Sequence, residues 1–342
     1  MSFPSTVEAI TVPQPGAVEV LEKRTWPFPK VEPNHIVIKI EYLGINFIDT
    51  YFRSGLYPLK QYPAILGKEA AGRIVALPTD PAVLNDPVFK SQGFDVGSKV
   101  AVEYDATHAT YISIPWTKAQ PVPQEVSTLT AAAGLLQALT AVTFTDEAYN
   151  IKKGDTILVH TVAGGLGLLL AQIGKLRGAT VIGTTSNAEK AALAKASGAD
   201  HVILYPVEDT VQRVLEITNG EGVHAIFDGV GKDTFDKNFK MIRRKGTIVS
   251  YGNASGPVPP FPLLKLVEKN VVLVRPTMSN YVYTHEEHRH YGHKVFDLIA
   301  SGALKIQVHK EYPFTAEGVQ QAQRDLVGGK TTGKLVVKVT DE

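Results

Sequence analysis

The sequence predicts an α/β protein in which a doubly wound parallel sheet is inserted into a β-rich domain. From Asp155 to about residue 275, apolar strand patterns alternate with helical patterns, as in a parallel sheet covered on both faces. Residues 1–129, in contrast, contain mostly strand patterns. The length of 342 residues exceeds one ordinary core and suits two domains.

The N-terminal part is expected to contain four strands, at residues 36–40, 72–77, 99–102 and 111–114. A short helix is expected from Phe47 to Phe52. The stretch from Pro78 to Gly97 is interpreted as a surface loop, because proline and aspartate interrupt it. Pro121 and Pro123 then mark the connection into a helix rich in alanine and leucine, from Leu129 to Tyr149.

Six strands are expected in the second part, near residues 156–160, 179–184, 201–205, 223–228, 246–251 and 271–275. Helices fall between them, for example over 188–196 and 208–218, and six such strands complete a Rossmann sheet. A helix over 286–301 and a strand over 334–339 do not extend this sheet, so they are assigned to the first domain. The predicted domains are therefore residues 1–129 with 281–342, and residues 130–280.

A glycine-rich turn follows the first strand of the predicted Rossmann sheet. It reads Ala163-Gly164-Gly165-Leu166-Gly167 and leads directly into an apolar helix. Glycines let the backbone approach a pyrophosphate, and the helix N-terminus offers free N–H groups. The spacing is not G-x-G-x-x-G, so the motif alone is weak. The strand before it, the helix after it and the second strand beyond favour a dinucleotide site over a structural turn.

The end of the second strand indicates which dinucleotide binds. NAD sites commonly carry an acidic residue there for the ribose 2′-hydroxyl, but this chain has Thr184, Ser186 and, one helical turn later, Lys190. Hydroxyl donors and a cation suit a 2′-phosphate. NADPH is therefore predicted over NADH, and the alternative is that Lys190 is an ordinary solvated lysine.

Composition excludes several classes of function. The net charge of +1 gives no reason to expect a nucleic-acid or membrane partner for the chain as a whole. Cysteine is absent, which excludes disulfides, thiolate catalysis and cysteine-ligated zinc. No apolar run reaches the length of a membrane span, and the N-terminus lacks a signal-peptide pattern, so a cytoplasmic location is expected.

Two other motifs are interpreted as non-functional. The run from Gly328 to Leu335 approaches a P-loop, but it precedes a terminal strand instead of opening a helix. Four histidines cluster in the C-terminal helix without the spacing of a zinc motif, and a solvated helix is preferred over a metal site. They are His285, His288, His290 and His293.

Four stretches of the chain together resemble one family. They are Asn46–Pro58, Leu66–Gly72, Ala163–Gly167 and Val249–Gly256, and they are similar to the zeta-crystallin-type NADPH:quinone oxidoreductases, the zinc-free branch of the medium-chain dehydrogenase/reductase superfamily. The resemblance covers nearly the whole chain, and the Pro78–Gly97 stretch looks longer than in bacterial members. It implies a GroES-like fold for the β-rich catalytic domain, NADPH as cofactor, and a homodimer or tetramer.

The resemblance also implies a set of site residues. Asn46 and Tyr51 are implied as catalytic residues beside the nicotinamide. Together with the residues of the glycine turn and of the second strand's end, it gives the predicted cofactor contacts Asn46, Thr140, Ala163, Gly164, Gly165, Leu166, Gly167, Thr184, Ser186, Lys190, Tyr205, Tyr251, Gly252, Asn253 and Lys330. Some relatives carry arginine at the last of these positions, and lysine offers a point charge instead of a fork.

No metal is expected in this chain. Zinc-dependent relatives carry cysteine and histidine where this chain has Asn46 and Lys68, and an amide and an ammonium do not replace those ligands. Without a Lewis acid, the acceptor must itself accept a hydride readily, as quinones and activated enals or enones do. Asn46 and Tyr51 are expected to hold the nicotinamide and to orient the acceptor oxygen.

Several alternatives stay open. Tyr51 is otherwise a core aromatic with a satisfied hydroxyl, and Arg53 is expected to pair with Asp49 at helical i,i+4 spacing. The enzyme is otherwise an NADPH-dependent 2-alkenal or enone reductase on the same fold. A further alternative is an NADPH-binding, crystallin-like protein, or one that binds AU-rich RNA as some family members do.

Overall fold

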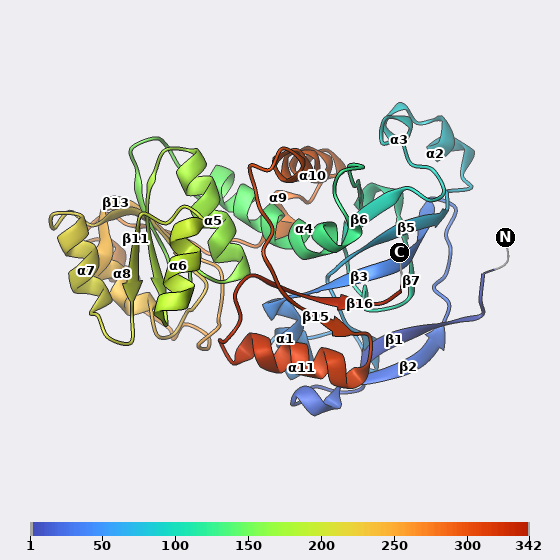
Figure 1. Ribbon diagram of the computed structural model, residues 1–342, viewed down its shortest axis with the longest axis horizontal. Coiled ribbons are helices and arrows are strands. Elements are labelled where there is room, and N and C mark those ends of the chain that lie inside the picture. The colour runs from blue at the N-terminus through green and yellow to red at the C-terminus, as the bar shows by residue number, and fades with distance from the viewer. Residues whose placement is uncertain (1–2, 341–342) are drawn as a thin grey trace. The chain divides into compact units, whose positions relative to one another are not determined.

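The computed structural model describes residues 3–340 (Figure 1). It divides into two compact units. The first unit contains the chain up to Leu136, the segment Thr284–Ser301 and the chain from Ile306 onward. The second contains Gln137–Tyr283 and Gly302–Lys305. The predicted class is confirmed: a unit built on a parallel sheet is inserted into a β-rich unit.

The first unit contains two sheets. The larger has seven strands, in the order β15-β16-β3-β5-β6-β8, with β7 also paired to β3. These strands are β3 (His35–Ile45), β5 (Glu69–Ala76), β6 (Lys99–Glu103), β7 (Tyr111–Pro115), β8 (Ala119–Pro121), β15 (Val308–Pro313) and β16 (Lys334–Lys338). The smaller sheet has the order β2-β1-β4, with β1 (Thr6–Val12), β2 (Glu22–Pro27) and β4 (Ala64–Ile65). All four predicted strands exist, and their apolar side chains fill one core.

Several helices of the first unit lie outside the predicted set. Of these, α11 (Ala316–Val327) lies alongside β15 and β16 (Figure 1). The Pro78–Gly97 stretch, expected to be a loop, contains α2 (Pro81–Asn85) and α3 (Pro87–Ser91). The prediction was wrong because the residues that interrupt the pattern start these helices: aspartate side chains cap both, and proline takes the first helical position of each. The predicted helices correspond to α1 (Phe47–Ser54) and α10 (His285–Ala300).

The second unit is built on a parallel six-stranded sheet with the order β11-β10-β9-β12-β13-β14. This is the Rossmann order 3-2-1-4-5-6. The strands are β9 (Thr156–Val159), β10 (Thr180–Thr185), β11 (His201–Leu204), β12 (Val223–Asp228), β13 (Ile242–Ser250) and β14 (Val272–Val274). All six predicted strands are therefore confirmed, with small shifts at their ends.

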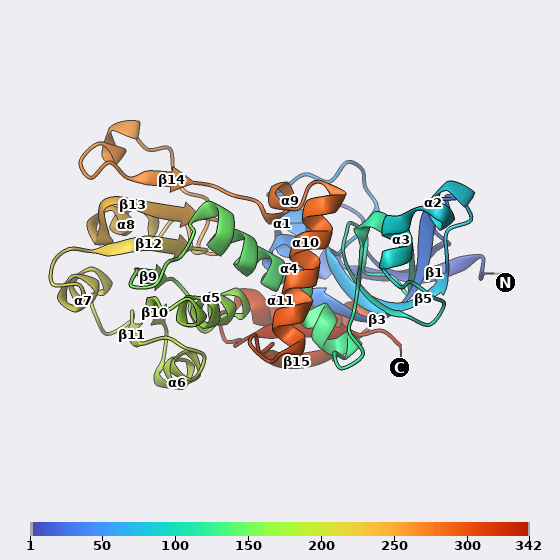
Figure 2. The ribbon, with the colours of Figure 1, turned by 90° about the horizontal axis from the view of Figure 1, so that it is seen from above.

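Helices cover both faces of this parallel sheet. Figures 1 and 2 show α5 (Gly165–Leu176) and α6 (Ala188–Ala196) on one side, and α7 (Thr210–Ile217) and α8 (Phe235–Met241) on the other. The short helix α9 (Met278–Tyr281) follows the last strand. Because the sheet is covered on both sides, its central strands are buried and apolar, as their sequences indicate.

The long apolar helix predicted before the Rossmann sheet is α4 (Thr128–Thr143), which continues as one π-helical turn, Phe144–Ala148. By length and composition alone, the segment Thr128–Ala148 is apolar enough to cross a membrane. However, 72% of its apolar window is buried inside the structure. We therefore interpret it as a core helix.

Candidate functional site

The glycine turn lies between β9 and α5 at the carboxyl end of the parallel sheet. α5 begins at Gly165, with Gly164 as its N-cap. A Cβ atom at Gly167 would come within 2.5 Å of the Thr161 carbonyl oxygen and 2.7 Å of the Val162 Cα atom. Only glycine lets the helix pack this closely on the turn. The first backbone N–H groups of a helix have no partner inside it, so this helix end is suited to a phosphate.

The neighbouring edge of the sheet supports the NADPH prediction. Ser186 directly follows β10, and Asn187 caps α6 by accepting the Lys190 backbone N–H at 2.9 Å. The Tyr205 backbone N–H donates to the Thr185 carbonyl at 3.1 Å, so this exposed ring follows β11 at the same edge. The structure thus brings Ser186, Lys190 and Tyr205 to the carboxyl ends of two adjacent strands.

Thr184 lies inside the protein instead of on this edge. Its hydroxyl oxygen accepts the Thr161 backbone N–H at 3.3 Å and lies 3.2 Å from the His160 Nδ1 atom. The side chain is buried. This geometry shows that Thr184 fixes the turn before the glycines, and a direct contact with the cofactor stays a prediction.

A buried polar network, which the sequence analysis missed, connects the ends of β9 and β12. The His160 Nε2 atom lies 2.9 Å from the Asn238 Oδ1 atom, and the Asn238 amide donates to Asp228 at 2.6 Å. The Asp228 carboxylate also accepts the backbone N–H groups of Val230 and Gly231 and the Thr234 hydroxyl. Asp228 is fully buried, so it organises the loop after β12 from within. An aspartate at the end of a strand was the available signal.

The loop after β13 contains three of the predicted cofactor residues, Tyr251, Gly252 and Asn253. The Tyr251 ring packs against Phe144, with centroids 5.6 Å apart. A Cβ atom at Gly252 would come within 2.2 Å of the Gly229 carbonyl oxygen, so this position requires glycine. Arg275, which was not predicted, donates to the Ser250 hydroxyl, the Gly252 carbonyl and the Asn253 side chain, each at 3.0–3.1 Å. The arginine therefore fixes the shape of this loop.

In the first unit, the predicted catalytic residues lie at the start of α1. Asn46 is the N-cap of this helix and is buried. Tyr51 lies one turn later, and its ring meets the Tyr57 ring edge-on at a centroid distance of 5.2 Å. The Asp49 carboxylate accepts the Asn46 backbone N–H at 2.8 Å, and burial raises the pKa of Asp49 to about 7.

The expected pair between Arg53 and Asp49 does not form. The Arg53 guanidinium donates to the Gln323 side chain at 2.7 Å and to the Gly16 carbonyl. The prediction was wrong because the i,i+4 rule describes side chains on an exposed helix surface. Asp49 is instead buried under the helix N-terminus.

Lys68 forms an ion pair with Asp105 at 2.5 Å, and its ammonium lies 5.4 Å from the centre of the Phe52 ring. Within residues 3–340 no group of three histidine, cysteine, aspartate or glutamate side chains is arranged to hold a metal ion.

Lys330 is exposed in the turn between α11 and β16. The predicted residues of the first unit are thus Asn46, Tyr51 and Lys330, and all the others, Thr140 of α4 included, belong to the second.

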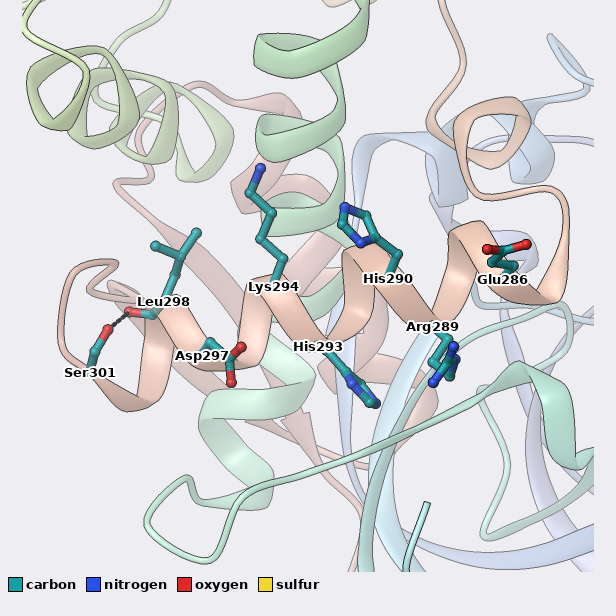
Figure 3. Close-up of a pocket in the computed structure, with 8 residues that line it drawn as sticks. All are labelled: Glu286, Arg289, His290, His293, Lys294, Asp297, Leu298 and Ser301. Atoms are coloured by element: carbon teal, nitrogen blue, oxygen red, sulfur yellow. Dashed lines mark hydrogen bonds between the residues drawn. The ribbon is translucent and has the colours of Figure 1, made fainter. Parts of the chain in front are cut away.

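The histidine-rich helix α10 carries a surface hollow of about 660 Å³, lined by Glu286, Arg289, His290, His293, Lys294, Asp297, Leu298 and Ser301. In Figure 3, His290 and Lys294 point away from the side that carries Arg289 and His293, so these side chains do not converge. None of the predicted site residues lines this hollow.

The prediction of a solvated helix was wrong at His288. This side chain is buried, and its Nδ1 atom lies 2.7 Å from the Gln120 amide nitrogen. Burial lowers the pKa of His288 to about 4. The helix therefore packs on β8 through a neutral histidine, which its polar sequence concealed.

Comparison with known families defines the class of protein. Residues 32–143 match the family model described as the alcohol dehydrogenase GroES-like domain, and residues 165–297 match the model described as zinc-binding dehydrogenase. A GroES-like unit combined with a Rossmann unit defines the medium-chain dehydrogenase/reductase superfamily. The zinc named in that description is not matched by the donors that Asn46 and Lys68 offer, because an amide and an ammonium do not replace cysteine and histidine ligands.

Individual relatives define the family within this class. A probable quinone oxidoreductase from Schizosaccharomyces pombe is 38% identical over 336 residues, which are 97% of each chain. Two solved structures with NADPH are similar over 97% of this chain and all of theirs. They are a mycobacterial protein (TM-score 0.90, 38% identity) and the Escherichia coli quinone oxidoreductase (TM-score 0.89, 34% identity). A 2-haloacrylate reductase from a Burkholderia species is 30% identical over 89% of this chain and 91% of its own. The chain belongs to the quinone oxidoreductase family, the zinc-free branch of this superfamily.

Proposed function

We propose that this protein is an NADPH:quinone oxidoreductase that transfers a hydride from NADPH to a quinone without a metal. The observation that carries the proposal is the edge where β10 and β11 end, beside the glycine turn. It presents Ser186, Lys190 and Tyr205, and the two residues that directly follow β10, Ser186 and Asn187, are not acidic. This donor set suits the 2′-phosphate that distinguishes NADPH from NADH.

NADPH supplies the hydride when it is bound, and the residues of the chain position it and exclude water. The first N–H groups of α5 bind the pyrophosphate, and Lys190 with Ser186 and Tyr205 binds the 2′-phosphate. Tyr251, Gly252 and Asn253 support the nicotinamide ribose. Thr184 acts indirectly, since its hydroxyl is hydrogen-bonded to the turn itself.

Asn46 and Tyr51 serve the nicotinamide end, with different roles. The Asn46 amide nitrogen donates to Glu69 at 2.9 Å and to the Gly44 carbonyl at 3.3 Å. An amide has two N–H donors, so both are used inside the protein. Neither N–H group of Asn46 is therefore left to bind the acceptor oxygen. We assign to Asn46 the positioning of the nicotinamide ring, and to the Tyr51 hydroxyl the orientation of the acceptor oxygen. Two electrons and one proton arrive as hydride, and Tyr51 or solvent supplies the second proton of the hydroquinone.

The test is NADPH consumption at 340 nm with 9,10-phenanthrenequinone, repeated with NADH and in the presence of a chelator. Loss of NADPH that requires the quinone, is weak with NADH and is unaffected by the chelator supports the proposal. Equal rates with both cofactors would contradict the assignment of Ser186, Lys190 and Tyr205 to the 2′-phosphate. Inhibition by the chelator would contradict a metal-free reaction.

The second candidate is an enone reductase, which the similarity to a 2-haloacrylate reductase favours. Turnover with a short 2-alkenal and none with the quinone would establish it, because the cofactor site is the same and only the acceptor differs. NADPH binding without turnover of any acceptor would instead favour the crystallin-like or RNA-binding role.

We further propose that the protein works in the cytoplasm as a homodimer or a tetramer. β14 is the edge strand of the parallel sheet, and large apolar side chains near it are exposed, namely Leu263, Leu264, Val267 and Val272. An edge strand and exposed apolar side chains favour pairing with a second copy. Sedimentation of the purified protein tests this, and a monomer at micromolar concentration would contradict it.

A further inference from the structure

A lysine is completely buried next to Asn46, the residue to which we assign the positioning of the nicotinamide ring. Lys334 is among the largest side chains without solvent exposure, and its partner Glu69 is equally buried. The Lys334 Nζ atom lies 2.6 Å from the Glu69 Oε2 atom and 2.5 Å from the Asn46 Oδ1 atom. The same Glu69 oxygen accepts the Asn46 amide N–H at 2.9 Å. Asn46, Glu69 and Lys334 thus form a closed triangle, which we call the Lys334 network.

The surrounding backbone is built to admit this network. Lys334 begins β16, Glu69 begins β5, and Asn46 follows the end of β3, which pairs with both strands. The second Glu69 carboxylate oxygen accepts the Leu136 backbone N–H of α4 at 2.6 Å. A Cβ atom at Gly44 would come within 2.3 Å of the Glu69 carboxylate, so glycine is required to leave room for the acid.

The chemistry of the two partners allows one orientation of the Asn46 amide. An ammonium only donates hydrogen bonds, and a carboxylate only accepts them. A flipped amide would place its NH₂ group against the Lys334 ammonium and its oxygen against the Glu69 carboxylate. Both contacts would then be repulsive between side chains that are shielded from solvent. The Lys334 network therefore holds the Asn46 side chain in a single state.

Stability alone gives a weak reason for such a pair. Burying an ammonium and a carboxylate costs desolvation that their attraction often fails to recover, and apolar replacements of the whole pair are often neutral or stabilising. Orientation of a neighbouring polar group is a property that apolar residues do not supply. The geometry points to Lys334 as a positioning residue that, through its ion pair with Glu69, fixes Asn46 for hydride transfer. This inference rests on the proposed function of Asn46.

The experiment compares Lys334→Met, Glu69→Gln and the double variant Lys334→Met/Glu69→Gln, with Lys338→Met as a control on the same strand. Each single variant leaves one uncompensated buried charge, whereas the double variant restores charge balance. In the double variant, the glutamine at position 69 still offers Asn46 an oxygen acceptor, but Lys334→Met removes the cation that selects the amide orientation. For each variant, kcat and KM for NADPH and 9,10-phenanthrenequinone are measured together with Tm.

We expect the double variant to recover a Tm near that of the wild type, with KM for NADPH little changed. Its kcat should remain lower by roughly tenfold to a hundredfold, as misplacement of a reacting group costs. The control should keep kcat within about twofold, as for a substitution away from the site. In an Asn46→Ala background, Lys334→Met should lower kcat no further, because the residue it positions is gone.

Wild-type kcat in the double variant would overturn the inference, and so would an equal effect of Lys334→Met with and without Asn46. Failure of the double variant to fold would assign the pair to stability and overturn it as well. Absence of any quinone-dependent turnover by the wild type would refute the proposed function itself. If instead the wild type is active and the variants keep its kcat, only the role of Lys334 is refuted and the proposed function stands.

Discussion

Replacing Gly167 by alanine tests whether the glycine turn is built for a phosphate. The added Cβ atom would lie 2.5 Å from the Thr161 carbonyl oxygen, and ordinary van der Waals contact begins at 3.4 Å. Relief therefore requires the start of α5 to move by about 0.9 Å. Alanine favours a helix by roughly 1 kcal/mol over glycine, but overpacking of this kind costs about 1–3 kcal/mol.

A shift of this size matters most for the N–H groups that meet the pyrophosphate. If the cost falls on the bound state, NADPH affinity decreases by roughly tenfold to a hundredfold, since about 1.4 kcal/mol corresponds to tenfold. Calorimetric titration with NADPH measures this directly, and thermal unfolding reports the effect on the free protein. Gly164→Ala is the matched comparison, because its Cβ atom would have one close contact, at 3.3 Å, and should cost less.

An NADPH Kd within twofold of the wild type in Gly167→Ala, together with an unchanged Tm, would refute this reasoning. An equal loss in both variants would show that the close approach of α5 to Thr161 is not the cause. Loss of Tm with unchanged affinity would assign Gly167 to packing alone.

Three further substitutions test separate parts of the site. Lys190→Glu should weaken NADPH by at least about tenfold through the loss of a charge-assisted contact while leaving NADH nearly unaffected, and equal effects in a titration with each cofactor would reject the 2′-phosphate assignment. Tyr51→Phe should lower kcat for the quinone by roughly tenfold or more, in the range of general acid or orienting groups, and unchanged steady-state kinetics would return Tyr51 to a packing role. Asp49 has its pKa raised by burial from 3.8 to about 7, so the folded state binds more protons than the unfolded state between these values and stability falls as pH rises through them. We therefore expect the free energy of unfolding, measured with urea, to decrease less from pH 5 to pH 8 in Asp49→Asn than in the wild type. Equal decreases in the two proteins would show that Asp49 does not titrate in this range.

The strands and helices of the parallel sheet could be predicted because their information is local. Each strand and helix of the second unit has its own period of apolar residues, and their alternation indicates parallel strands joined by right-handed connections. The glycine turn was equally readable, since the strand before it and the helix after it lie within a few residues. The absence of an acid at the end of the second strand, over residues 184–187, is also a property of one short segment.

The sequence was less informative where the pairing partner is distant. The residue pattern did not predict β1, β2 and β15, and β2 is polar and largely exposed. Polarity also concealed the burial of His288 and the role of Arg275, whose partners at the end of β13 and in the loop after it lie 22 to 25 residues away along the chain. The short helices of the Pro78–Gly97 stretch depend on aspartate caps, which also occur in ordinary turns.

The sequence by itself determined the fold class, the family and the cofactor, because strand periodicity, glycine spacing and the donors near Lys190 are features of short segments. Only the tertiary structure decided the state of Asn46. Its partner Lys334 lies 288 residues away along the chain, and a lysine in an apolar strand pattern is ordinarily solvated. The physical reason is that a charge becomes buried only when folding brings its counter-charge and hydrogen-bond acceptors to the same place.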